Sequence, residues 1–417
     1  MLTIAIASIP TSIIVMSFLY GIATLYSLIK DLRKRVWLDP STNFMKSEDD
    51  VLPRVAIIVP LYKEDRQHIM ETYKSIAAQL YPLDRMMVFT VLENEDVYTK
   101  KYVEELKHIL VEANVLFSIH VNNGLRTSKA AAINSILPKI IDKYDVILIL
   151  DAGDKILDRN YIIKCVKLIK SGYNIIGAKV YRIGYNIIAK FSYIDTVLWY
   201  NVSFPAIHSL TKVPFLSGEG MVVTTDFLKR IGFFPEVLAE DSYIAMLGLI
   251  YGEKIGLIDS IILEGAPSSL ADLVKQRLRW YRGGLECLKD FLVKYRKNVP
   301  LNAIVKICIA YLQTVALTAP FISLIVIVFS FFINIPSFLL TLAKLEIISI
   351  MLSPCALYIV NEVKDLTLFL APLNWFLQSF IALVAIIPMK IPWLRTTNRS
   401  SINIPSYSEV SMSIIDT

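Results

Sequence analysis

The chain has 417 residues, of which 55% are hydrophobic and 19% charged, and its mean hydropathy is +0.53. This composition argues against a purely soluble enzyme, because the apolar excess is larger than one soluble domain normally carries. The net charge of +6 is modest, and the basic residues gather beside apolar stretches instead of forming one Arg/Lys-rich stripe. That pattern favours membrane lipids over nucleic acid as partners.

The first 30 residues are predicted to form a transmembrane helix. Leu2 to Ile29 carry no formal charge, and a helix of that length exceeds the roughly 30 Å hydrocarbon core of a bilayer. Four basic residues follow within residues 30–35, and none precedes the helix. The positive-inside rule therefore places the following region in the cytoplasm, with residues 31–52 as a linker. The charge order also indicates an uncleaved anchor and not a signal peptide.

Residues 53–275 are expected to form an α/β domain. Short β-branched runs begin at Val55, Met86, Leu116, Val146 and Asn174, and segments with a helical pattern separate them. Near-continuous apolar strands that alternate with helices are typical of a parallel or mostly parallel sheet covered on both faces. Ligands of such sheets bind beyond the carboxyl ends of the strands, so the residues after each strand are candidates for chemistry.

Acidic residues follow three of these strands. Glu64 comes after the first, Glu93 after the second, and Asp151 with Asp154 after the fourth. Carboxylates that meet at one edge repel each other unless a cation or a proton lies between them, so the pattern favours a divalent metal with oxygen ligands. The alternative is that these residues only cap the following helices.

Three further motifs lie downstream. Ser217-Gly218-Glu219-Gly220 forms a flexible turn before an apolar run, and Glu240-Asp241 precedes a helical pattern whose N-terminus would favour negative charge. The segment Gln276-Arg277-Leu278-Arg279-Trp280 places its first, fourth and fifth residues on one helical face. Residues 276–300 are predicted to form an amphipathic interface helix, which could bind an anionic phosphate and a sugar, lie on the membrane, or do both.

Residues 301–390 are predicted to contain about three more membrane spans, at about residues 304–334, 338–360 and 366–389. Pro320 and Pro354 interrupt two of them, and Lys344 with Glu346 weakens the middle one. The count is open by one span, because three spans would place the tail outside while basic residues after the last span favour the inside. Residues 391–417 are expected to form a polar tail. No zinc spacing among the four histidines, no CxxC and no P-loop occurs in the sequence.

The order of these motifs resembles the membrane-bound family-2 glycosyltransferases, which include cellulose, chitin and hyaluronan synthases and ceramide glucosyltransferase. The most specific part is the pair Glu240-Asp241 followed about 35 residues later by QRLRW at Gln276. Supporting segments are VPLYKED at Val59 and KAAAIN at Lys129. The resemblance implies a GT-A fold, flanked by transmembrane helices, that transfers a hexose from a nucleotide sugar with inversion.

The resemblance also implies roles for individual residues. Glu64, Glu93 and Lys129 would bind the nucleotide-sugar donor, and Asp151 with Asp154 would hold Mg²⁺ or Mn²⁺. Gly153 stands where the family's DxD motif has its second aspartate, so Asp154 would have to substitute one residue later. The remaining roles concern catalysis, the diphosphate and the acceptor: Asp241 as general base, Gln276 and Arg279 on the diphosphate, and Trp280, Glu240 and Gly218 at the acceptor.

The acceptor stays open at this point. The expected function is extension of a polysaccharide from a nucleotide sugar, most simply a UDP-sugar, by a multi-pass membrane protein with a cytoplasmic catalytic domain. One alternative is a single addition to a lipid carrier or glycolipid. A second is a non-catalytic protein that binds sugar nucleotides and has lost its metal site, which Gly153 motivates.

Overall fold

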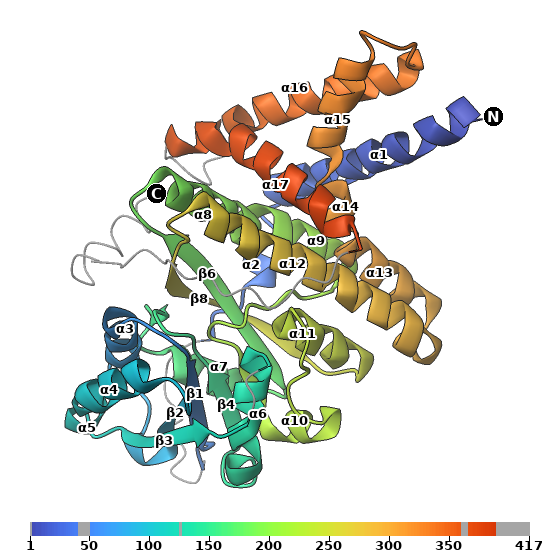
Figure 1. The fold of residues 1–417 in the computed structure, drawn as a ribbon. Coiled ribbons are helices and arrows are strands. Elements are labelled where there is room, and N and C mark those ends of the chain that lie inside the picture. The colour runs from blue at the N-terminus through green and yellow to red at the C-terminus, as the bar shows by residue number, and fades with distance from the viewer. Residues whose placement is uncertain (1, 41–50, 125–126, 360–365, 389–417) are drawn as a thin grey trace. The chain divides into compact units, whose positions relative to one another are not determined.

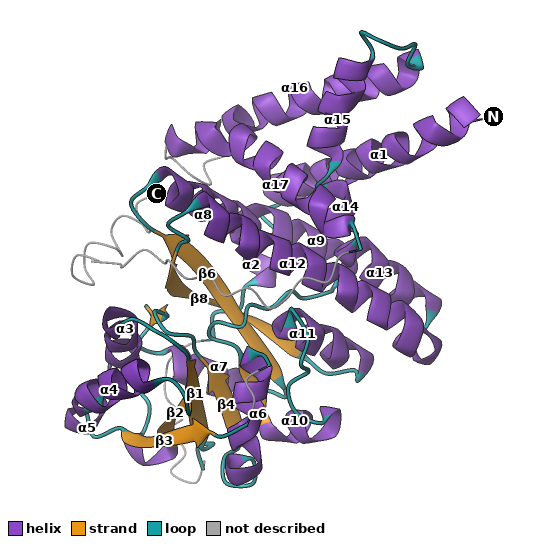
Figure 2. Cartoon of the chain, in the orientation of Figure 1, coloured by secondary structure: helices purple, strands orange, loops and turns teal. Residues whose placement is uncertain are grey.

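The computed structural model describes residues 2–40, 51–124, 127–359 and 366–388 (Figures 1 and 2). The chain divides into two compact units. The sheet unit comprises Trp37–Arg182 and Pro214–Gly265, and the helical unit comprises Met1–Val36, Ile183–Val213 and the chain from Ala266 onward. The contacts thus group residues 183–213 and 266–275 with the helices, although the sequence analysis assigned them to the α/β domain.

The sheet unit contains an eight-stranded sheet of order β3-β2-β1-β4-β7-β6-β8-β5. Its strands are β1 Val55–Leu61, β2 Met86–Glu93, β3 Leu116–Asn122, β4 Val146–Ile149, β5 Lys155–Ile156, β6 Ile175–Ile183, β7 Val222–Thr224 and β8 Ile255–Gly265. All five predicted strands are present. The sheet is mixed, because β1 to β4 run parallel while β7 pairs antiparallel with both β4 and β6.

The burial of the central strands β1 and β4 explains why the sequence predicts them clearly. Every residue of β1 and β4 is buried, as expected for apolar strands that are covered on both faces. In the register, Leu61 of β1 lies opposite Leu92 of β2, and Ile58 lies opposite Ile149 of β4. The carboxyl ends of β1, β2 and β4 therefore meet at the same edge of the sheet, and the polar residues that follow them share that edge.

In the described residues of the sheet unit, seven helices connect or follow these strands: α3 Arg66–Ala77, α4 Val97–Leu106, α5 His108–Glu112, α6 Lys129–Ile140, α7 Tyr161–Lys170, α10 Thr225–Ile231 and α11 Glu240–Ile250. A short 3₁₀ turn, η1 Leu83–Arg85, precedes β2. Side-chain caps fix the N-termini of two helices, α4 and α6. Asp96 accepts the Thr99 N–H at the start of α4, and Ser128 accepts the Ala131 N–H at the start of α6.

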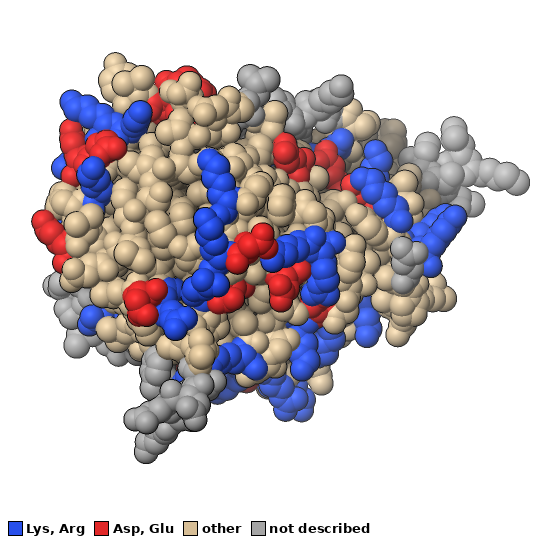
Figure 3. All heavy atoms as spheres, turned by 90° about the horizontal axis from the view of Figure 1, so that it is seen from below, with Lys and Arg blue, Asp and Glu red and all other residues tan. Residues whose placement is uncertain are grey.

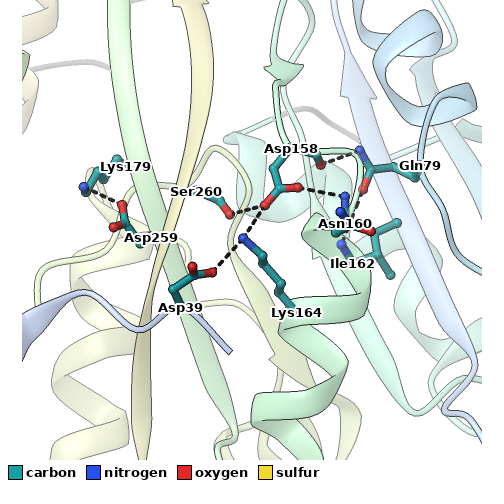
Figure 4. Close-up of polar contacts among 9 residues, drawn as sticks. All are labelled: Asp39, Gln79, Asp158, Asn160, Ile162, Lys164, Lys179, Asp259 and Ser260. Carbon is teal, nitrogen blue, oxygen red and sulfur yellow. Dashed lines mark hydrogen bonds and ion pairs between the residues drawn. The ribbon is translucent and has the colours of Figure 1, made fainter. Parts of the chain in front are cut away.

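The linker after the first helix joins the sheet unit as a short parallel bridge between Leu38 and Ile258 of β8. The Leu38 N–H donates to Leu257 O at 2.7 Å. Asp39 then pairs with Lys164, whose Nζ also lies 2.8 Å from Asp158 (Figure 4). These contacts hold the linker against β8 and α7.

The surface in Figure 3 carries basic and acidic side chains interspersed among uncharged ones. Exposed pairs occur in the sheet unit, for example Lys107 Nζ and Glu104 Oε2 at 2.7 Å. Such pairs contribute about 0–1 kcal/mol each, so buried strands and helix faces account for most of the stability.

The helical unit contains α1 Leu2–Ile29 and the segments α2 Arg33–Val36, α8 Ile187–Leu198, η2 Trp199–Ser203, α9 Phe204–Thr211, α12 Leu270–Asp290, η3 Phe291–Tyr295, η4 Arg296–Asn298, α13 Leu301–Tyr311, α14 Gln313–Ala316, α15 Ala319–Phe329, α16 Ser337–Ile359, η5 Leu366–Leu370 and α17 Ala371–Ile386. Helix α9 packs on α1, and α12 packs on α17. The segment predicted as an interface helix, residues 276–300, lies in α12, which begins at Leu270 and ends at Asp290, and in the short segments η3 and η4 that follow.

Within the described residues, three helical segments are long and apolar enough to cross a bilayer: Ala7–Ile29, Ser337–Cys355 and Leu366–Ile386. A fourth candidate, Leu301–Ala316 with Ala319–Phe329, is bent by 48°. Pro320 explains the break, because it cannot donate to the preceding turn and so occupies the first turn of a new helix. The Phe321 N–H there donates to Ser379 Oγ of α17 at 2.9 Å.

The charged residues of α16 lie in different surroundings. Glu346 is buried and accepts a hydrogen bond of 2.8 Å from Ser17 Oγ of α1, whereas Lys344 is exposed. Pairing within the unit thus accommodates the buried acid in an apolar helix. The predicted tail at residues 391–417 lies outside the described residues.

Candidate active site

The turn after β4 carries the predicted metal-binding residues. Gly153 adopts a φ of +91°, a backbone conformation that residues with a Cβ rarely adopt. Its N–H donates to Thr72 Oγ1 of α3 at 2.9 Å, and the Thr72 hydroxyl lies 3.2 Å from Asp151 O. A Cβ at Gly153 would meet the His68 ring at 3.5 Å, an ordinary contact distance. Backbone conformation, and not lack of space, therefore explains the glycine.

Asp154 folds back into this turn. Its side chain is fully buried, and its Oδ2 accepts the Asp151 N–H at 2.6 Å. Burial, together with the nearby charges of Asp151, Glu219 and Glu264, raises the pKa of Asp154 well above its usual value. Its Oδ1 is buried and has no hydrogen-bond partner among the described residues. The described part of the chain holds no group of three or more His, Cys, Asp or Glu arranged for a metal ion, so the joint metal ligation by Asp151 and Asp154 stays a prediction.

Lys129 lies among the acids that the sequence analysis selected. Its Nζ is 2.7 Å from Asp151 Oδ1 and 3.9 Å from Glu240 Oε1, and the lysine is nearly buried. Burial lowers the pKa of Lys129, but the negative charges of Asp151, Glu240 and Glu219 outweigh it and raise the pKa above its usual value. Lys129 is therefore a fixed cation, placed there by the capped N-terminus of α6.

Asp241 and Glu240 form the first turn of α11. Burial raises the pKa of Asp241 to about 7, and the charges of Glu240 and Glu219 add to the rise. The Ser242 N–H, which donates to Asp241 Oδ1 at 2.6 Å, and the Lys129 charge act in the opposite direction. Asp241 is thus a carboxyl that changes protonation near neutral pH.

Gly218 marks the point where these side chains meet. A Cβ at Gly218 would lie 3.1 Å from Lys129 Nζ, 3.5 Å from Glu240 Oε1 and 3.9 Å from Asp241 Oδ2. A side chain at position 218 would therefore crowd the charged groups. The structure brings together five of the predicted site residues here: Gly218, Lys129, Asp151, Glu240 and Asp241.

A buried network beside this site was missed by the sequence analysis. Arg182 of β6 lies 3.1 Å from Glu219 and 2.6 Å from Glu264 of β8, and both Arg182 and Glu264 are almost fully buried. Glu219 is the residue between the glycines of the Gly218–Gly220 turn, so the network anchors that turn. The available signal was one arginine in β6 and one glutamate in β8, each near the end of a largely apolar strand.

The predicted nucleotide-binding acids occupy the parallel part of the sheet. Glu93 ends β2, is buried, and accepts a hydrogen bond of 2.9 Å from Asn122 Nδ2 at the end of β3. The Glu64 N–H donates to Thr99 Oγ1 of α4 at 3.0 Å, and the Glu64 side chain is half-buried. Glu93, the last residue of β2, and Asp151, just after β4, thus lie at strand ends that share one edge of the sheet, with β1 between the two strands.

Gln276, Arg279 and Trp280 belong to α12 of the helical unit, so the helical spacing expected for them is observed. Gln276 is buried and accepts a hydrogen bond of 2.7 Å from Arg277 Nη1. The Trp280 ring centroid lies 4.1 Å from Arg277 Cζ.

The family model of glycosyl transferase family group 2 matches residues 146–388, more than half of the chain. The chain belongs to this glycosyltransferase family. The match includes the Asp151 turn, the Glu240-Asp241 pair and the QRLRW segment of α12, and it confirms the family-2 resemblance and the glycosyltransferase assignment.

A solved glycosyltransferase structure confirms the GT-A type of fold. The mannosyltransferase PcManGT from Pyrobaculum calidifontis, in complex with GDP-Man and Mn²⁺, matches with a TM-score of 0.63 and 19% identity, covering 91% of this chain and 98% of that one. TarS 1–349 from S. aureus matches at 14% identity over 78% of this chain and 90% of its own, with a TM-score of 0.40 that is too low to carry an inference. No curated protein matches the sequence.

Proposed function

We propose that this glycosyltransferase moves a hexose from a nucleoside-diphosphate sugar to an acceptor at the membrane, with inversion at the anomeric carbon and Asp241 as the general base. The observation that carries the proposal is the convergence of Lys129, Asp151, Glu240 and Asp241 around Gly218 in a chain of this family. A carboxyl whose pKa lies near neutral pH, beside a fixed cation, suits a reaction that removes one proton from the acceptor and releases one anionic leaving group.

Asp241 supplies the base. As an acceptor hydroxyl oxygen bonds to the anomeric carbon, its proton passes to a carboxylate oxygen of Asp241, and the bond from the anomeric carbon to the diphosphate oxygen breaks. A base works best when its pKa lies near the working pH, and the pKa of about 7 meets this condition. Attack from the face opposite the leaving group gives inversion.

Lys129 stabilises the departing nucleoside diphosphate, whose negative charge grows as the bond breaks. Its ammonium is held in place by Asp151 and Glu240 before substrate binds, so little rearrangement is needed during the reaction. Gly218 leaves space beside Lys129, because any side chain at position 218 would lie against the Lys129 ammonium. Glu93 and Glu64 bind the nucleotide in this proposal, and Gln276 and Arg279 bind the diphosphate while Trp280 orients the acceptor.

The residues fit a divalent metal. Asp151 is a carboxylate at the site, and the buried Oδ1 of Asp154 has no hydrogen-bond partner among the described residues. Mg²⁺ is commonly held by one or two carboxylates with substrate phosphates as further ligands, so a set of three protein ligands is not required. Mg²⁺ or Mn²⁺ on Asp151 would neutralise diphosphate charge when bound, and the Mn²⁺ in the PcManGT complex supports this choice.

For the acceptor, a lipid carrier or glycolipid is favoured over an exported polysaccharide. The described part of the chain offers three candidate spans, or four with the bent pair. The polar side chains Asn374, Gln378 and Ser379 of α17 are buried, and Gln378 bonds to Tyr281 at 2.7 Å and to Asn374 at 3.2 Å. Polar side chains that are buried and bonded in this way, with few candidate spans, favour an enzyme that adds one sugar. The sheet unit faces the cytoplasm in this proposal, as the charges after α1 indicate.

The test uses the full chain purified in nanodiscs and supplied with Mg²⁺ or Mn²⁺. Radiolabelled GDP-mannose and a set of UDP-sugars are offered with a membrane lipid extract, and the products are separated by solvent extraction and gel filtration. Label in the organic phase supports single addition to lipid, and label in a large polymer supports the polysaccharide alternative. No transfer from any donor would support a non-catalytic sugar-nucleotide-binding protein and contradict the proposal.

A further inference from the structure

Arg277 is a charged residue that the proposed mechanism does not use. It lies in the first half of α12, between Gln276 and the pair Arg279-Trp280, and its side chain is fully buried. A guanidinium keeps its positive charge in proteins, so burying it is costly unless charged and polar partners surround it. The contacts of Arg277 therefore indicate why the helical unit holds a charge there.

The guanidinium contacts an acid, an amide and an aromatic ring among the described residues. Its Nη2 forms an ion pair with Asp195 Oδ2 of α8 at 2.8 Å, and its Nη1 donates to Gln276 Oε1 at 2.7 Å. Its Cζ lies over the Trp280 ring, 4.1 Å from the centroid. One side chain thus contacts an acid on a neighbouring helix and two residues of its own helix that the proposed mechanism uses.

The contact with Gln276 sets the direction of the amide. Arginine has only donors, so the oxygen of Gln276, and not its nitrogen, must face Arg277. The amide nitrogen, with its two N–H donors, is therefore turned away from the guanidinium. Donors in that position suit an oxygen-rich ligand such as a diphosphate or a sugar hydroxyl. Without Arg277 the amide could rotate and offer its oxygen instead, which a phosphate would repel.

The contact with Trp280 fixes the plane of the indole. A guanidinium stacked on tryptophan is among the stronger cation–π arrangements, and it is stronger when both groups are shielded from water. The ion pair with Asp195 holds the guanidinium in place, and the guanidinium in turn covers one face of the ring. The orientation of Trp280 therefore depends on an acid that comes from α8.

We propose that Arg277 is a positioning residue that fixes the amide of Gln276 and the ring of Trp280 in the orientations used for sugar transfer. Its effect on turnover rests on the proposed function, whereas its effect on the orientation of Trp280 does not. The competing explanation is purely structural, with Arg277 serving only to join α12 to α8 through Asp195.

Two substitutions separate these explanations. Arg277→Lys keeps a positive charge for Asp195 but loses the planar fork that contacts Gln276 and Trp280 together. Arg277→Met removes every polar contact and keeps the apolar stem. Arg282→Met is the matched control, since Arg282 is an arginine of the same helix whose partners are Glu286 and the backbone carbonyls of Ala385 and Ile387.

The first measurement is steady-state transfer by the full chain in nanodiscs, with thermal melting of each variant. A misplaced contact group can cost about 100-fold in rate, so we expect kcat to fall about 10- to 100-fold in both Arg277 variants. Arg282→Met should stay within about threefold of the unsubstituted chain. Recovery of kcat in Arg277→Lys would support the purely structural role and overturn the proposal, as would an Arg277→Met loss matched by Arg282→Met.

The second measurement needs no activity. The chain has five tryptophans, so the fluorescence of Trp280 is obtained as the difference between each protein and its Trp280→Phe partner. Acrylamide quenching of this difference signal should rise in both Arg277 variants and not in Arg282→Met. An unchanged quenching constant in Arg277→Met would overturn the proposal even if no donor were turned over. Absence of transfer by the unsubstituted chain, with increased quenching in both variants, would contradict the proposed function alone.

Discussion

The protonation of Asp241 gives a prediction that can be worked through quantitatively. The base must be ionised to accept the acceptor proton, and its pKa of about 7 lies about three units above the ordinary aspartate value. At pH 6 about one tenth of the Asp241 side chains are ionised, and at pH 8 about nine tenths, so kcat/KM should rise nearly tenfold between these values. Below pH 6 the rate should fall about tenfold per pH unit.

The structure also predicts how the midpoint of the pH profile, which is set by the pKa of Asp241, shifts in a variant. Glu219 is one of the charges that raise the pKa of Asp241, so Glu219→Gln should shift the midpoint of the pH profile to a lower pH. The charge of Lys129, in contrast, lowers the pKa of Asp241. The assay is initial-rate transfer at low donor concentration from pH 5 to 9, with Asp226→Asn as the control, since Asp226 is an exposed acid in the first turn of α10. A profile that is flat from pH 5 to 8, or a midpoint near 4, would refute the assignment of the base.

Three further predictions follow from the same geometry. Lys129→Met leaves Asp151 and Glu240 without their cation, so transfer should fall about 100- to 1,000-fold in kcat, while a fall below tenfold would show that the lysine does not stabilise the leaving group. Gly153→Ala forces a Cβ into the left-handed region and should lower the free energy of unfolding by about 1–2 kcal/mol in denaturant titrations, whereas unchanged stability would show that the turn relaxes easily. Asp241→Asn should raise the melting temperature at pH 8 but not at pH 4. The pKa of Asp241 is higher in the folded state than in the unfolded state, so ionisation of Asp241 between pH 4 and 7 lowers the stability of the fold, and asparagine removes this cost. Equal effects on the melting temperature at both pH values would contradict this.

The sequence predicted the parts of the fold that have a strong local signal. Four of the five predicted strands are mostly buried apolar runs, as β1 and β4 illustrate, and such runs have few other structures available to them, whereas β3 is partly exposed. β5, with two residues, and β7, with three, are too short to show a period. β8 is longer, but its run from Ile255 contains polar residues at Asp259 and Ser260 and was not recognised as a strand.

The part of the candidate site that lies at the carboxyl ends of the parallel strands was predictable from the sequence. Residues at the carboxyl ends of parallel strands share one edge, and this rule predicts Glu93 and Asp151 as site residues from the sequence alone. The buried pairing of Arg182 with Glu219 and Glu264 was not predictable, because it joins three segments through the antiparallel half of the sheet, which has no local signature. The direction of the Gln276 amide likewise depends on a contact that spacing alone cannot specify.

Single-turnover transfer by Asp241→Asn is the most direct test of the central claim that this carboxylate takes the acceptor proton. The variant keeps the size of the side chain and removes its basicity, and donor binding is measured in parallel by calorimetry. The account predicts a donor Kd within about threefold of the unsubstituted chain and a transfer rate lowered about 100- to 10,000-fold. A variant that binds donor normally and still transfers sugar at more than a tenth of the original rate would contradict it.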